Sequence, residues 1–177
     1  YDKFIHNVHH GIKNLIVGDA LDESTQIGPL AKKQFVKDLD ALVWSSVNDG
    51  AKCIIGGKKK GCYYLPTLLV DIDENMSVFK NETFGPVFCL TKIKDVDEAI
   101  RLANKSKYGL GGSLWTSNIR FAKEIIEKID TGAIFINEMT KSDPRLPFGG
   151  INKSGYGIEL SRFGIKEFVN TKTIVVN

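Results

Sequence analysis

The sequence predicts an α/β fold with three αβα layers, in which helices cover both faces of a largely parallel sheet. Strand-like apolar runs alternate with helix-like segments along the chain, and this alternation favours crossover connections between parallel strands. The length of 177 residues suits about one domain with a substantial core. The content of 42% hydrophobic and 25% charged residues is ordinary for a globular protein.

The first half of the chain predicts two helices followed by strands. Apolar residues recur at helical spacing over residues 2–15, and a loop follows. Pro29 then favours the start of a long helix that continues to about Val47 with its apolar residues on one face. Three lysines at residues 58–60 form a loop between strands. The strands expected in this half cover residues 51–57, 63–72 and 87–93.

The second half begins with a helix over residues 95–109. Asp95 is its expected N-cap, Glu98 stands three residues later as in a capping box, and Gly109 is expected to end the helix. The elements predicted next are a strand at 110–116, a helix at 118–130 and a strand at 132–137.

Two segments after these elements have no regular pattern of a packed strand or helix. Residues 138–157 form a loop rich in Gly and Pro, which in a parallel sheet should lie at the carboxyl edge, where ligands bind. Residues 167–177 are predicted to form a late strand without a partner in the domain, so we expect it to pair with another chain. The domain proper is therefore expected to cover residues 1–166.

Composition and charge argue against several classes of partner. The net charge of +3 is mild, and the lysine run at 58–60 lies between two glycines, which is typical of a solvated loop and not of a nucleic-acid surface. The chain has no apolar run of bilayer length and no charged-then-apolar leader. We therefore expect no nucleic acid and no membrane as partners, and a cytoplasmic location.

Neither the cysteines nor the histidines form a pattern typical of a disulfide frame, a metal site or a nucleophile. Cys53 and Cys89 lie in apolar strand patterns and Cys62 ends a loop, so none has the electropositive, accessible setting of a reactive thiol. Their odd number and the absence of CxxC spacing fit a reducing compartment. The only histidines have metal-compatible spacing, but no other ligand type clusters with them, and we expect no metal. They are His6, His9 and His10.

The stretch NETFGPVF at residues 81–88 is a candidate binding site. The Glu82 carboxylate can accept hydrogen bonds from two neighbouring sugar hydroxyls, and the Phe84 ring can lie against a planar heterocycle. Gly85 and Pro86 would fix the turn that aims both side chains. The alternative is a capped turn before a core strand, with Phe84 buried.

The glycine-rich loop contains a second group of candidates. PFGG and SGYG lack the order of a phosphate-binding loop, so their glycines more plausibly let the backbone pass close to a pocket that Phe148 lines. Ser142 and Arg145 can bind a carboxylate, Arg145 through two parallel donors. The alternative for Arg145 is a solvated surface side chain. Glu159 stands at an expected helix start, where it can also serve as a capping carboxylate.

These motifs together resemble the aldehyde dehydrogenase superfamily over nearly the whole chain. ETFGPVF, YGLGGSLWT, TGAIFIN and PFGGINKSGYGIEL occur in the family's order with fitting gaps, and VGDALDESTQIGPL is similar to the loop after its catalytic region. SDPRLPFGG, followed by FGIKEFVNTKT, is most similar to the succinate-semialdehyde dehydrogenase branch. Ile158 departs from the pattern, since the family usually has Arg before the matching Glu.

The resemblance implies a role for each candidate. Glu82 would bind the nicotinamide-side ribose of NAD or NADP, and Phe84 would contact the nicotinamide. Phe148 would line the aldehyde pocket, and Ser142 matches the position that binds the carboxylate of succinate semialdehyde. Glu159 matches a carboxylate thought to relay protons toward the general base. Arg145 is a substrate-binding candidate from its charge and place alone.

The resemblance also implies that much of the catalytic machinery comes earlier in a full-length enzyme. The family oxidises an aldehyde through a Cys thiohemiacetal and hydride transfer, and a Glu activates water to release the acid. That Cys, that Glu and the Rossmann cofactor-binding domain precede the point that matches Tyr1. The chain is therefore expected to be a C-terminal fragment, inactive alone, whose last strand joins a homo-oligomer, a dimer or a tetramer.

Two other functions remain open from the sequence. The substrate of the whole enzyme can be another semialdehyde or an aliphatic aldehyde. Alternatively, the chain is a non-catalytic binding or assembly module that keeps this fold. A reading frame that continues upstream of Tyr1 into a segment with the nucleophilic Cys would favour the enzyme.

Overall fold

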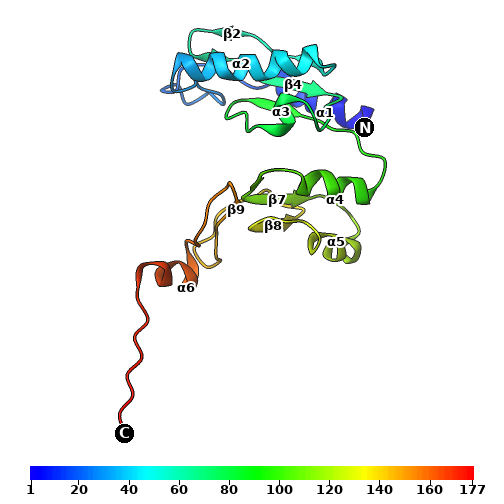
Figure 1. Ribbon diagram of the computed structural model, residues 1–177. Helices are drawn as coiled ribbons and strands as arrows, with labels where there is room; N and C mark the ends of the chain where they lie inside the picture. Colours follow the sequence, from blue (N-terminus) through cyan, green and yellow to red (C-terminus); the bar gives the residue numbers. More distant parts are fainter. The chain divides into compact units, whose positions relative to one another are not determined.

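The computed structural model describes residues 1–177, which form two compact units, Tyr1–Lys94 and Asp95–Asn177. Figure 1 shows the helices and strands of each unit. No helix combines the length and the apolar composition that a bilayer-spanning segment needs. The first unit contains α1 (Asp2–Lys13), α2 (Lys33–Asn48), β1 (Lys52–Ile55), β2 (Lys59–Lys60), β3 (Tyr63–Tyr64), β4 (Thr67–Val70), α3 (Ser77–Lys80) and β5 (Val87–Cys89).

The second unit has shorter elements and a longer stretch without regular structure. It contains α4 (Val96–Asn104), β6 (Tyr108–Gly109), β7 (Gly111–Leu114), α5 (Ile119–Ile126), β8 (Ala133–Ile136), β9 (Ile151–Asn152), α6 (Ser161–Gly164) and the 3₁₀ helix η1 (Ile165–Phe168).

Strand β4 is the centre of the first unit. All four of its residues are buried, and Leu69 packs in one core with Leu39 and Val43 of α2. Because successive side chains of a strand point to opposite faces, Leu68 and Val70 face away from this core. Helix α1 contacts both β1 and β4. The amphipathic pattern predicted for α2 thus finds its apolar partner in β4.

The strands form four small sheets with both parallel and antiparallel pairs, which corrects the prediction of one largely parallel sheet. The pairs β4–β5 and β7–β8 are parallel, whereas β1–β4, β2–β3 and β6–β9 are antiparallel. The reason lies in the connections. Helices α3 and α5 supply the crossovers that parallel neighbours need, but β2 and β3 are joined by a two-residue turn at 61–62, which only antiparallel strands can use. The α/β class holds, and the three-layer arrangement remains a prediction.

Three helix boundaries differ clearly from the predicted ones, and one of them is the end of α5, which lies at Ile126 and not at residue 130. Helix α2 begins at Lys33 and not at Pro29, because the Leu30 N–H donates to the Cys62 carbonyl (2.8 Å) and so ties this segment to the β2–β3 turn. Helix α4 ends before Gly109, which pairs with Ile151 instead. A Cβ at Gly109 would lie 2.6 Å from Ile151 Cγ1, so this glycine permits close strand contact. The Asp95 N-cap is confirmed, with Oδ1 accepting from the Glu98 N–H at 2.8 Å.

The C-terminal segment pairs with no other part of this chain, so the strand expected at residues 167–177, which was predicted to pair with another chain, stays a prediction. Ile165–Phe168 is a 3₁₀ helix, and residues 169–177 have no assigned secondary structure. A strand exists only through hydrogen bonds to a neighbour, and no other part of the chain pairs with this segment. Its apolar side chains, among them Phe168, Ile174 and Val176, are exposed.

Candidate functional site

The long loop starts after β8, at the carboxyl end of the parallel pair β7–β8, but it does not stay at this edge as predicted: it runs back along β7, so that Thr140 lies against Gly111 and Gly149 against Gly132, just before β8. Asn137 follows β8 with a φ of 55°, and its side chain binds the start of the segment that leaves β7. Asn137 Oδ1 accepts from the Thr116 N–H and Nδ2 donates to the Thr116 carbonyl, both at 2.8 Å. This pair of hydrogen bonds fixes the two strand ends together and sets the direction in which the loop departs.

Glycines allow the backbone of the loop to pass so close to the strands that no side chain would fit between them. A Cβ on Gly132, just before β8, would lie 1.7 Å from the Gly149 carbonyl oxygen. The next segment is tied back by two backbone hydrogen bonds, from the Phe148 N–H to the Glu159 carbonyl (2.9 Å) and from the Glu159 N–H to the Phe148 carbonyl (2.8 Å). The close backbone approach that the PFGG motif predicts is therefore present.

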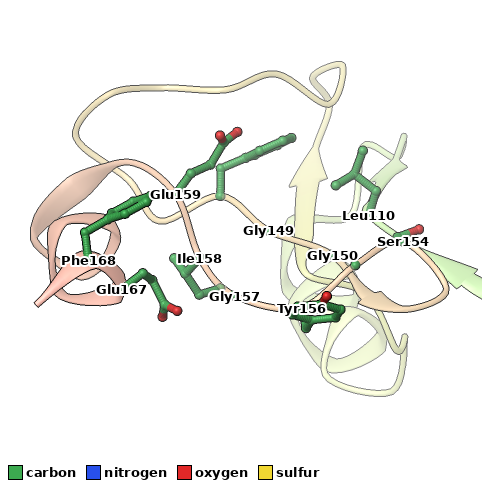
Figure 2. A pocket seen from close by; sticks show the side chains of 12 residues that line it. Leu110, Gly149, Gly150, Ser154, Tyr156, Gly157, Ile158, Glu159, Glu167 and Phe168 are labelled. Carbon is green, nitrogen blue, oxygen red and sulfur yellow. The ribbon is translucent and has the colours of Figure 1, made fainter. Parts of the chain in front are cut away.

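This loop and the C-terminal helices line an open cavity of about 460 Å³. Figure 2 shows Glu159, Ile158, Glu167 and Phe168 at one end and Leu110, Ser154 and Tyr156 at the other. In this view the carboxylates of Glu159 and Glu167 point to opposite sides, so they do not resemble a pair that shares a proton. Phe148 also lines the cavity, so two of the predicted residues, Phe148 and Glu159, come together here.

Glu159 does not begin a helix, contrary to the prediction. Helix α6 starts at Ser161 after Leu160, and both have a positive φ (53° and 63°). The antiparallel bridge to Phe148 holds Glu159 in extended backbone instead. A capping role for this carboxylate is therefore not supported, whereas its place at the cavity leaves it open to solvent and ligands.

Arg145 binds a neighbour within the same loop. Its Nε donates to Asp143 Oδ1 at 2.9 Å and its Nη2 to Asp143 Oδ2 at 2.6 Å, while the Arg145 N–H donates to Oδ1 at 2.9 Å. The two parallel donors that the sequence offers to a substrate carboxylate are thus occupied by Asp143. Hydrogen bonds from the Arg145 side chain and then from its amide hold the pKa of Asp143 well below its usual range. The pair therefore stays ionised at neutral pH and is lost only as the pH falls below the ordinary range of an aspartate.

Ser142 precedes this ion pair and is exposed. Neither Ser142 nor Arg145 is among the residues that line the cavity. The structure therefore places the four predicted residues of this loop in two groups. Phe148 and Glu159 lie at the cavity, and Ser142 and Arg145 stand on the solvent-exposed turn before it.

Glu82 and Phe84 lie beside a separate apolar cavity of about 580 Å³ in the first unit. Phe84 is 81% exposed with a φ of 41°, so the alternative of a buried core phenylalanine is wrong. An exposed carboxylate next to an exposed ring fits a ligand that carries hydroxyls and a flat heterocycle. The apolar wall comes from α2 and the segment before it, and the lining includes Leu30, Phe35, Leu39, Leu42, Glu82 and Phe84.

Several lining residues were not identified from the sequence. Glu167 and Phe168 reach the loop cavity only because η1 turns back toward it, and no local pattern indicates this turn. Tyr156 belongs to the SGYG motif. It is fully exposed and stands between Gly155 and Gly157, whose φ angles of 127° and 84° glycine adopts readily.

Two of the three thiols, those of Cys53 and Cys89, lack the features of a nucleophile. Burial raises the pKa of Cys53, and burial raises the pKa of Cys89 to about 11. Both side chains pack against the core of the first unit. At neutral pH these groups are therefore thiols and not thiolates. No group of three or more His, Cys, Asp or Glu side chains is placed to hold a metal ion.

We expect Cys89 to react slowly with iodoacetamide in the folded chain at neutral pH. Because the thiolate is the reactive form, its rate should rise roughly tenfold per pH unit up to a pH of about 11. Mass spectrometry of the alkylated chain measures this rate, and the denatured chain, in which burial is lost, is the control. Equal rates at neutral pH in the folded and denatured chains would contradict the burial argument.

Comparisons with known proteins agree on one family. The model of the aldehyde dehydrogenase family matches residues 1–174. A probable succinate-semialdehyde dehydrogenase [NADP(+)] of Synechocystis sp. is 45% identical over 176 residues, which covers 98% of this chain and 39% of that protein. An aldehyde dehydrogenase of Paenarthrobacter nicotinovorans is 44% identical over 177 residues, with the same coverage of 98% and 39%. The chain thus spans about two fifths of the length of these relatives.

Solved structures give the same result. Succinic semialdehyde dehydrogenase from Streptococcus pyogenes, in complex with NADP+, matches with a TM-score of 0.94 and 37% identity, over 99% of this chain and 39% of that one. An aldehyde dehydrogenase of Mycobacterium tuberculosis, complexed with NAD+, matches with a TM-score of 0.95 and 32% identity, over 100% of this chain and 38% of that one.

Proposed function

Since the chain belongs to the aldehyde dehydrogenase family, we propose that the full-length protein is an NADP-dependent succinate-semialdehyde dehydrogenase and that these residues form most of its catalytic domain. The observation that carries this proposal is the Phe148–Glu159 pair, which two backbone hydrogen bonds hold beside the cavity, with Ser142 on the exposed turn that precedes it. The relatives named for succinate semialdehyde and NADP support the choice of substrate and cofactor.

On this proposal the first unit holds the nicotinamide end of the cofactor. The exposed Phe84 ring offers a face to a planar heterocycle, and the Glu82 carboxylate accepts hydrogen bonds from ribose hydroxyls. The apolar cavity beside them offers further nonpolar contact to the cofactor. When bound, the cofactor supplies the acceptor for the hydride that leaves the substrate.

The second unit handles the substrate. Ser142 binds the carboxylate of the aldehyde through its hydroxyl, and Phe148 forms an apolar wall beside the carbonyl end. Glu159 lies exposed at the same cavity and passes protons toward the general base. Burial keeps Cys53 and Cys89 protonated at neutral pH, and on this proposal other parts of the full-length protein supply the attacking Cys and the general-base Glu, so the chain alone is inactive.

The C-terminal residues 167–177 serve on this proposal as the strand that joins two copies. Exposed apolar side chains such as Ile174, Val175 and Val176 need a partner, and a second copy of the chain can supply a sheet edge. We expect deletion of residues 167–177 from the full-length protein to reduce its oligomeric mass, as measured by analytical ultracentrifugation. An unchanged mass would remove this role.

Replacing Ser142 with alanine tests the substrate. In the full-length protein we expect S142A to raise KM for succinate semialdehyde about 10- to 100-fold, because a hydrogen bond to a charged group is lost. KM for butanal, which has no carboxylate, should change little. Steady-state kinetics with both aldehydes measures the difference, and Ser117→Ala, at an exposed serine after β7, is the control. Equal effects of S142A on both aldehydes would point to another aldehyde as the substrate.

A further inference from the structure

We propose that Asp143 and Arg145 act as one positioning unit for Ser142, and that Arg145 does not itself bind the substrate. The ion pair fixes a short turn whose geometry sets the place of the Ser142 hydroxyl. This inference rests on the proposed function, since it assumes that Ser142 binds the carboxylate of the aldehyde. It makes the two residues determinants of specificity without direct contact to the substrate.

The first support is the set of three hydrogen bonds that Arg145 donates to the Asp143 carboxylate. The carboxylate accepts from Nε, Nη2 and the backbone N–H of Arg145, at 2.9, 2.6 and 2.9 Å. In addition, the Leu146 N–H donates to the Asp143 carbonyl at 2.9 Å, which closes a β-turn over residues 143–146 with Pro144 at its second position. Side chain and backbone therefore stabilise the same turn.

The second support is the exposure of the two partners. The Arg145 side chain is 86% exposed, whereas that of Asp143 is only 20% exposed. If Arg145 turned away to bind a substrate carboxylate, it would break both side-chain hydrogen bonds to Asp143, and the new ion pair would only replace the one that was lost.

The third support is that the turn is tied to the segment that carries Glu159. The Ser161 N–H donates to the Pro144 carbonyl at 3.1 Å, and the Phe148–Glu159 bridge follows four residues later. Phe148 has its own pair of hydrogen bonds to Glu159, so it should keep its place when the turn loosens. Ser142 precedes the turn without such a tie, so its position depends on the Asp143–Arg145 pair.

Three variants of the full-length protein separate positioning from direct binding. We expect D143N and R145Q each to raise KM for succinate semialdehyde about tenfold or more through misplacement of Ser142, while kcat and the KM for butanal stay nearly unchanged. The double variant should have a KM for succinate semialdehyde no higher than that of either single variant, because each single change already breaks the Asp143–Arg145 pair. The control is K141Q, which removes a neighbouring cation that pairs with Glu138, and it should leave both KM values unchanged.

The inference would be overturned if D143N and R145Q changed the KM for succinate semialdehyde in opposite directions. In D143N the Arg145 cation is released, so if Arg145 bound the substrate directly, D143N would lower KM for succinate semialdehyde while R145Q raised it. A double variant whose loss equals the product of the single losses would also contradict a shared role.

Amide hydrogen exchange distinguishes this inference from the proposed function. D143N and R145Q should both accelerate exchange at Leu146 and Ser161, the amides that bind the Asp143 and Pro144 carbonyls. If the wild-type protein does not prefer succinate semialdehyde but exchange is accelerated, the substrate assignment fails and the turn-fixing role holds. If exchange is unchanged in both variants, the positioning unit is wrong whatever the substrate.

Discussion

Replacing Gly132 with alanine is expected to lower the free energy of unfolding by about 3 kcal/mol or more, through overpacking. The new Cβ would lie 1.7 Å from the Gly149 carbonyl oxygen and 2.8 Å from its carbon, so backbone has to move. That movement displaces the segment that carries Phe148 and Gly149 from the start of β8. In the full-length protein we therefore also expect a large loss of kcat/KM with succinate semialdehyde.

Gly112→Ala is the matched control for this experiment. Gly112 lies in β7, paired with Ile134 of β8, and its added Cβ would meet only side-chain atoms at 3.9 Å or beyond. We expect its stability to stay within roughly 1 kcal/mol of wild type. Urea unfolding of both variants gives the free energies. Equal stability of the Gly132 and Gly112 variants would contradict the close approach of the loop backbone.

Replacing Leu39 with alanine is expected to cost about 2–5 kcal/mol of the free energy of unfolding. Leu39 is 1% exposed and belongs to the core that α2 forms with β4. It also lies directly under the Glu82–Phe84 turn, because a Cβ on Gly85 would be 2.4 Å from Leu39 Cδ2. The cavity left by the truncation should therefore loosen this turn and weaken the binding of NADP+ to the full-length protein.

Phe35→Ala is the control that distinguishes the effect of losing a core side chain from the effect of losing a side chain of the apolar cavity wall. Phe35 lines the same cavity from the same helix but is 49% exposed, so its truncation should cost less than roughly half of the Leu39 effect. Urea unfolding measures stability, and fluorescence titration with NADP+ measures binding. A Leu39 variant as stable as the Phe35 variant would show that α2 does not anchor this unit.

Local chemistry made part of the fold predictable from the sequence. Asp95 followed by Glu98 three residues later is a capping signal that depends on a single turn, and the structure has that cap. The strand–helix–strand order around α5 likewise predicts the parallel pair β7–β8. Each of these inferences requires only neighbouring residues.

The features that were missed depend on contacts that the sequence does not display. The turn at Leu160 and Ser161 requires two residues other than glycine with a positive φ, which local preference disfavours. It is this turn that directs α6 and η1, and with them Glu167 and Phe168, toward the cavity. In the same way, the charge of Arg145 suggested a substrate ligand, whereas the aspartate two residues earlier already holds its guanidinium.

The central claim is tested most directly by the rate of NADP+ reduction that the purified full-length protein shows with succinate semialdehyde and with butanal. We expect kcat/KM for succinate semialdehyde to exceed that for butanal about 10- to 100-fold, because only the former offers a carboxylate to Ser142. No NADPH formation with succinate semialdehyde, or equal kcat/KM values for the two aldehydes, would contradict the proposed substrate.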